Sequence, residues 1–134
     1  MINSLAHITV VLAGCYLLAL GAVALLRPAH ASRFLLGFVA SAYLHYFELL
    51  LRVAVGLAFV VHASRMMFGE LFTLFGWLLI GTTAILCCMP WRWHRRFAQW
   101  GVPYAVRYLS LVAMSSLAMG VVILVCTVPT FGSE

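Results

Sequence analysis

Four long apolar runs dominate this sequence and restrict its fold more than any other feature. They cover about residues 5–26, 42–64, 70–89 and 105–127. Each run approaches or exceeds the ~20 helical residues that cross a ~30 Å hydrocarbon core. Continuously apolar runs of this length satisfy their backbone groups in lipid as helices. Only 8% of the residues are charged, against about a quarter in soluble domains. The sequence therefore predicts an all-α protein, in which residues 1–134 form one integral membrane domain, a bundle of four transmembrane helices.

Short amphipathic segments follow the first and third runs. Pro28 and Pro90 end these runs, because proline cannot continue a helix ladder. In 29–40, Arg33 lies among apolar residues, which are Phe34, Leu35 and Phe38. On a helix over 91–100, the aromatic residues Trp93, Phe97 and Trp100 share one side, and the other carries Arg92, Arg95, Arg96 and Gln99. Both segments are predicted to be interfacial helices. The fourth run is expected to begin at Val102 and Pro103.

The basic residues are all arginines, and most of them flank these two segments. Six belong to this group, namely Arg27, Arg33, Arg92, Arg95, Arg96 and Arg107, whereas the opposite side has Arg65. The positive-inside rule makes the arginine-bearing side cytoplasmic and places both termini outside. We expect anionic lipid head groups as partners and no nucleic acid. The predicted head-group contacts are Arg92, Arg95, Arg96, Trp93 and Trp100, although these residues also serve as a topology signal and an interface anchor.

An acid and a base interrupt the second apolar run. Glu48 and Arg52 are four residues apart and share a helix face, which His45 and Ser41 extend by one and two turns. Together the two charges oppose membrane insertion of this helix by about 5–7 kcal/mol. The eleven Leu, Phe and Val residues between 44 and 61 favour insertion by about 3–7 kcal/mol, so the helix alone would insert only marginally. We therefore predict an intramembrane polar centre that faces the bundle or a partner. It is either a structural ion pair or a proton or anion site.

Two histidine patterns raise the question of a metal or haem. His45 and Glu48 have a metal-ligand spacing, but a di-metal site needs further carboxylates, and Glu70 belongs to the opposite face. His7 and His62 lie near the outer face on different helices, an arrangement that suits either solvated histidines or a bis-histidine haem. No catalytic triad, phosphate loop or nucleotide fingerprint is present. We expect no metal, no cofactor and no enzymatic activity.

A weak internal repeat divides the chain. With a shift of 62 residues, the half 1–64 matches the half 65–134 at these positions: Gly14 with Gly76, Leu17 with Leu79, Ala22 with Ala84 and Pro28 with Pro90. A shift of 63 pairs Arg33-Phe34 with Arg96-Phe97. Both halves then run the same way through the membrane, as a parallel repeat. The positions equivalent to Glu48 and Arg52 are Leu111 and Ser115, so the polar pair belongs to one half only.

Four stretches together carry a resemblance to a group of small, uncharacterised bacterial membrane proteins. They are Arg27-Pro28, His45-Tyr46-Phe47-Glu48-Leu49 to Arg52, Phe75-Gly76-Trp77 and Pro90-Trp91-Arg92-Trp93-His94-Arg95-Arg96-Phe97. The resemblance covers most of the chain and implies a four-helix inner-membrane protein of unassigned function. Locally, Leu50-Leu51-Arg52-Val53-Ala54-Val55-Gly56 through His62 is similar to the first helix of DoxX-type membrane proteins, some of which are linked to quinone-coupled redox systems. There the motif opens the chain, whereas here it forms the second span after Glu48, so no functional residue is carried over.

These features predict an accessory or assembly subunit of a larger membrane complex or of a homo-oligomer. Its polar centre would pack inward or against that partner. The first alternative is a small oligomeric transporter or proton-coupled permease that uses Glu48. The second alternative is a quinone- or haem-linked redox subunit.

Overall fold

A computed structural model describes residues 1–128, apart from the side chains of residues 38 and 39. Phe38 therefore lies outside the described side chains. The described part contains six α-helices and one 3-10 turn. They are α1 (Ile2–Leu26), α2 (Pro28–Ala40), α3 (Ala42–His62), η1 (Ala63–Arg65), α4 (Gly69–Cys88), α5 (Trp91–Arg107) and α6 (Leu109–Thr127).

Four of these helices are long and apolar enough to cross a membrane. They are α1, α3 with η1, α4 and α6, and they match the four predicted runs. The fourth differs at its start, because α5 continues through Pro103 to Arg107. A proline inside a helix removes one ladder hydrogen bond, yet the break falls at Tyr108, whose backbone leaves the helical region (φ −104°, ψ 35°). The fourth span therefore begins at Leu109 and not near residue 105.

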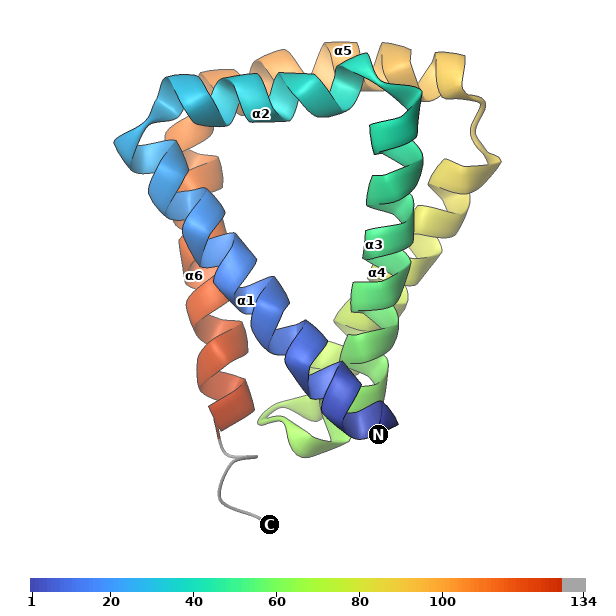
Figure 1. Ribbon diagram of the computed structural model, residues 1–134, viewed down its shortest axis with the longest axis vertical. Helices are drawn as coiled ribbons and strands as arrows, with labels where there is room; N and C mark the ends of the chain where they lie inside the picture. The colour runs from blue at the N-terminus through green and yellow to red at the C-terminus, as the bar shows by residue number, and fades with distance from the viewer. Residues whose placement is uncertain (129–134) are drawn as a thin grey trace.

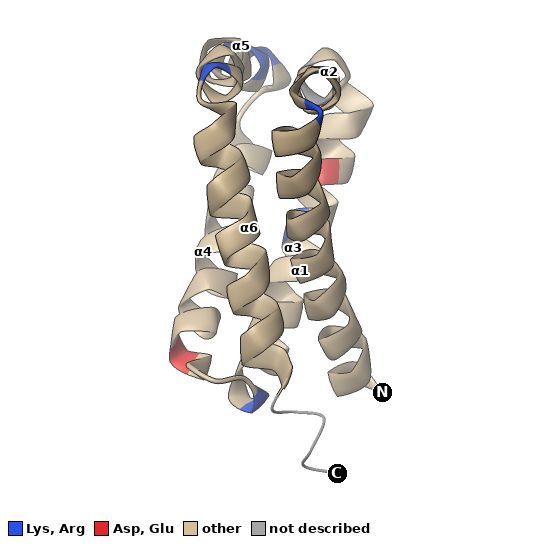
Figure 2. Cartoon of the chain, turned by 90° about the vertical axis from the view of Figure 1, so that its left-hand side faces the viewer, with Lys and Arg blue, Asp and Glu red and all other residues tan. Residues whose placement is uncertain are grey.

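The four long helices form two pairs, α1 with α6 and α3 with α4 (Figure 1). The pairs converge at the end of the molecule that holds the N-terminus, which we call the terminal end. They diverge toward the opposite end, where α2 and α5 lie across them. Figure 2 shows arginines gathered on α2 and α5, so we call this the basic end.

The main apolar core lies where all four long helices converge. It consists of Ala6, Val10, Ala58, Phe59, Ala63, Met66, Phe72, Ile123 and Cys126. A backbone hydrogen bond of 3.2 Å from Met67 N–H to the Cys126 carbonyl ties the α3–α4 connection to the end of α6. The two helix pairs are therefore joined firmly at the terminal end.

Glycines let the helices of each pair approach closely. A Cβ atom on Gly76 of α4 would lie 2.7 Å from the Gly56 carbonyl oxygen of α3. A Cβ atom on Gly120 of α6 would lie 2.9 Å from the Gly14 carbonyl oxygen of α1. Contacts of this kind between small residues are typical of helix packing in membranes. The two pairs are thus built around equivalent glycine crossings.

Most of the buried positions of the first half recur in the second. Residues of α3 and η1 match residues of α6 that lie 64 positions later: His45 with Leu109, Leu49 with Ala113, Gly56 with Gly120, Phe59 with Ile123, His62 with Cys126 and Ala63 with Thr127. Residues of α1 match residues of α4 that lie 62 positions later: Val10 with Phe72, Gly14 with Gly76 and Gly21 with Thr83. By this packing the equivalents of Glu48 and Arg52 are Val112 and Ser116, one residue beyond Leu111 and Ser115. The duplication itself stays a prediction, which this recurrence supports.

Candidate functional site

Glu48 and Arg52 form an ion pair midway along α3. Arg52 Nη1 donates a hydrogen bond of 3.3 Å to Glu48 Oε1. The pair forms because residues four apart on a helix project to the same face. The side chain of Glu48 is 38% exposed and that of Arg52 is 32% exposed. The chain therefore covers only part of the pair and does not seal it within the core.

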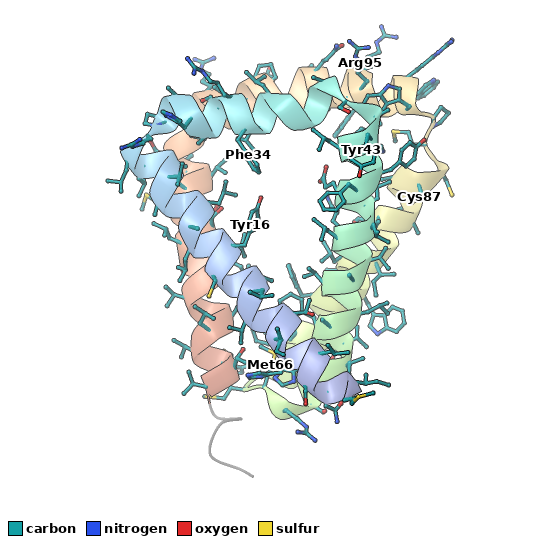
Figure 3. The ribbon with its side chains drawn as sticks, viewed as in Figure 1. Tyr16, Phe34, Tyr43, Met66, Cys87 and Arg95 are labelled. Carbon is teal, nitrogen blue, oxygen red and sulfur yellow. The ribbon has the colours of Figure 1, made fainter. Side chains whose placement is uncertain are left out.

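The other helix pair supplies a polar neighbour. Figure 3 shows Tyr16 of α1 and Phe34 of α2 pointing into the space between the two helix pairs. The Tyr16 hydroxyl lies within electrostatic range of the Glu48 carboxylate. Glu48 therefore faces a group on α1 as well as its partner on α3.

His45 joins this region to α5. Its side chain is 2% exposed, and its ring lies against that of His94, with centroids 3.7 Å apart and planes inclined by 32°. The Trp91 ring lies 5.2 Å from the His45 ring. We call this cluster, made of His45, Glu48, Arg52, Trp91 and His94, the polar corner. It connects the first turns of α3 and α5 to the ion pair.

The electrostatics of the polar corner disfavour a proton on His94. Burial lowers the pKa of His94. The Glu48 carboxylate raises this pKa, and the Arg52 guanidinium lowers it further. Among the described residues, Nδ1 of His45, Nδ1 of His94 and Nε of Arg52 are buried without a hydrogen-bond partner, as is Nδ1 of His62 at the terminal end. Unpaired buried polar atoms are rare in native proteins and call for an explanation.

Ser41 precedes the first turn of α3 and is joined to His45 through the backbone. It is the N-cap residue of α3, with an extended backbone (φ −127°, ψ 126°), and its side chain makes no capping hydrogen bond. Its carbonyl accepts a hydrogen bond of 3.2 Å from the His45 backbone N–H. Ser41 therefore starts the helix, and its link to the cluster runs through the backbone.

A second histidine pair lies at the terminal end. A hydrogen bond of 3.1 Å joins Nδ1 of His7 to Nε2 of His62, and the ring centroids are 4.8 Å apart. An iron held between two histidine nitrogens separates them by about 4 Å, twice a metal–nitrogen bond. The two rings contact each other directly, so in this arrangement they do not fit a bis-histidine haem. Within residues 1–128, no group of three or more His, Cys, Asp or Glu side chains is arranged to hold a metal ion.

The arginines and aromatic residues of α5 form an exposed surface. A hollow of about 590 Å³ is lined by Arg92, Trp93, Arg96, Phe97 and Trp100. Trp93 and Trp100 are 71% and 65% exposed, so the protein covers only a minor part of each residue. Arg95 points away from the helix pairs (Figure 3) and borders a separate hollow of about 260 Å³ between α2 and α5. Four of the five predicted head-group residues therefore line one hollow, and the fifth, Arg95, lines the other.

Sequence reasoning missed His94, Trp91 and Tyr16 as members of the site. A signal for the first two exists, because Trp91, His94 and Ala98 form a third face of the 91–100 helix, separate from its arginines and exposed aromatic residues. This face is the partly buried one. Its partner on α3 is distant in the sequence, so periodicity does not identify it.

Comparison with protein-family models, with curated proteins and with solved structures finds no match to this chain. The function is therefore inferred from the contacts of the chain itself.

Proposed function

We propose that this chain is a multi-pass protein of the bacterial inner membrane and an accessory or assembly subunit of a larger membrane complex or of a homo-oligomer. It has no catalytic activity of its own. The observation that carries the proposal is the partly exposed Glu48–Arg52 pair, which lies midway along a candidate membrane span.

Lipid tails offer no hydrogen bonds to the exposed part of this pair. A charged group at the centre of a membrane helix opposes insertion by about 2.5–3.5 kcal/mol, and such groups normally face a bundle interior, a cavity or a partner. The described part of the chain covers about two thirds of each side chain. A polar helix surface of a second copy or of another membrane protein completes the cover.

The charge distribution orients the subunit. The basic end holds six of the eight arginines, and neither α2 nor α5 contains an acidic residue. The positive-inside rule makes this end cytoplasmic and both termini periplasmic. The exposed indoles of Trp93 and Trp100 suit the head-group region, where amphipathic rings are enriched. The hollow on α5 would then contact anionic lipid head groups.

A double substitution, Glu48→Leu with Arg52→Leu, tests the assembly role. Replacing both partners of an ion pair by apolar residues is often neutral or stabilising, so the variant is expected to insert and fold. The tagged protein is purified in a gentle detergent, and co-purifying proteins and native mass are recorded. We expect the double variant to be a stable, dissociated subunit.

The matched control is Val112→Leu with Ser116→Leu, because these partly buried positions are equivalent in the second half. The control is expected to keep the wild-type assembly. If the Glu48→Leu/Arg52→Leu variant retains the same partners and mass as wild type, the assembly role of the pair is wrong.

A second candidate is a small oligomeric proton-coupled permease with Glu48 as the titrating group. It is favoured by the two histidines that lie within electrostatic range of Glu48. A flux assay in reconstituted vesicles, comparing wild type with Glu48→Gln, tests it. Equal flux in the two proteins rejects this candidate.

A further inference from the structure

The polar corner has an apolar counterpart in the same molecule. In the recurrence of buried positions, His45 of α3 corresponds to Leu109 of α6. The segments α2 and α5 are related by the 63-residue shift given above. That shift pairs Ala31 of α2 with His94 of α5. At that corner, which we call the apolar corner, the helices are joined by Ala24, Ala31, Leu109 and Ala113, with Leu35 packed against them. Ala31 is 1% exposed and Leu109 is 8% exposed, so the corner is closely packed.

This fold therefore closes a corner of this kind without any imidazole. At the polar corner, by contrast, two imidazole nitrogens and one guanidinium nitrogen are buried without partners. Each such group is destabilising, because it has lost its hydrogen bonds to water and gained none in the protein. Packing alone does not explain why the polar corner has His45 and His94 where the apolar corner has leucine and alanine.

We propose that the polar corner is a proton-binding site, in which the His45–His94 pair takes up one proton from the basic end and the Glu48 carboxylate balances its charge. The proton binds at a ring nitrogen of the pair, where the two Nδ1 atoms are unpartnered. This inference does not depend on the assembly function, because it holds for an isolated subunit.

The geometry limits uptake to one proton and sets the entry side. Two imidazolium rings with centroids 3.7 Å apart repel each other, so one charged ring disfavours the second. His45 is 98% buried and His94 is only partly buried, so the proton reaches His94 first. Among the described residues, the charged and titratable groups that face the pair are Glu48, Arg52 and Tyr46 of α3, the Tyr46 ring lying 5.3 Å from that of His45. Tyr16 of α1 faces Glu48.

Glu48 and Arg52 act on the pair with opposite signs, which provides the test. Histidine side-chain ¹⁵N NMR spectra of the full chain in nanodiscs are recorded from about pH 8 to about pH 5, around the usual histidine pKa. In Arg52→Gln, the unpaired carboxylate should raise the midpoint of His94 titration by about one pH unit. In Glu48→Gln, loss of the carboxylate should lower it by a similar amount. The His7–His62 pair at the other end should keep its midpoint in both variants.

A second variant separates proton binding from packing. His45→Leu with His94→Ala copies the residues of the apolar corner, so it is expected to fold with unchanged or higher thermal stability and to lose the uptake of one proton. The proposal is overturned if the Glu48→Gln and Arg52→Gln midpoints are equal or shift in the same direction. It is also overturned if the His45→Leu/His94→Ala variant fails to fold, since the imidazoles would then be required for packing.

Discussion

At the scale of single residues, His94 connects α5 to the charged residues of α3. Its ring contacts His45, and it lies within electrostatic range of Glu48 and Arg52. A partly buried imidazole without a partner at Nδ1 is held neutral, because burial removes the water that would solvate a charge. His94 is thus a titratable side chain at the contact between two helices.

This predicts that stability falls on acidification. Because burial lowers the pKa of folded His94 below its unfolded value of about 6.5, the unfolded chain binds more protons in the window just below pH 6.5. The free energy of unfolding is therefore highest above that pH. Below it, the free energy of unfolding declines by at most about 1.4 kcal/mol per pH unit. Thermal unfolding of the detergent-solubilised protein across this window measures the slope.

The control for the pH dependence is a second histidine at the same end. His94→Ala should flatten the decline, whereas His30→Ala, which removes an exposed ring on α2, should leave it unchanged. A wild-type slope that persists in His94→Ala would contradict the assignment to this residue.

At the scale of elements, the α3–α4 pair depends on a close backbone contact. The Gly76 position faces the Gly56 carbonyl oxygen and the Val60 side chain, both within 2.8 Å of an added Cβ. A backbone oxygen in a packed helix moves only if the helix moves. The pair is therefore held at a separation that glycine sets.

Replacing Gly76 by alanine should weaken this pair by about 1–3 kcal/mol, because the added methyl overpacks the contact. The matched control is Gly81→Ala on the same helix, where an added Cβ meets nothing within 4 Å. It should be neutral, or stabilising by up to about 1 kcal/mol through helix propensity. Unfolding by sodium dodecyl sulfate titration measures both, and equal effects would show that the close contact is not what holds the pair.

The element α5 carries its own prediction about lipids. Replacing Arg92 and Arg96 by glutamine should lower the preference for spin-labelled phosphatidylglycerol over phosphatidylcholine about thirtyfold at most, since each arginine contributes about 1 kcal/mol near a membrane surface. The control variant, Arg33→Gln with Arg107→Gln, removes the same amount of charge outside the hollow. It should lower the preference for phosphatidylglycerol less. Equal losses in the two variants would indicate a general surface charge and no site at the hollow.

At the scale of the whole molecule, two helix pairs meet at one end and diverge at the other. The large core joins them at the terminal end. At the basic end, α2 and α5 bridge them, through the apolar corner on one side and the polar corner on the other. One corner of a repeated packing pattern thus carries the charges, and the other corner shows how the same joint is made without them.

The orientation of the whole chain is tested with fusions at its C-terminus. The proposed topology, with the basic end in the cytoplasm, predicts a periplasmic C-terminus. A C-terminal alkaline phosphatase fusion should then be active and a C-terminal green fluorescent protein fusion dark. Fusions after residue 100, at the basic end, should show the reverse. An inactive phosphatase with a bright fluorescent fusion at the C-terminus would invert the proposed topology.

The sequence by itself determined the elements and the first contacts of the candidate site. Hydropathy located four long helices to within a few residues, except that α5 continued through Pro103 and moved the fourth start to Leu109. The spacing of Glu48 and Arg52 predicted their shared face, because that contact is local to one helix. Helical periodicity also predicted the exposed aromatic surface of α5.

Only the tertiary structure decided which helices pair and which residues meet across them. Four apolar helices present similar surfaces to one another, so hydropathy does not specify that α1 pairs with α6 and α3 with α4. The contact between His45 and His94 joins residues 49 positions apart, and the partial exposure of the ion pair depends on how far the helix pairs diverge. These features follow from packing between elements, which local periodicity does not encode.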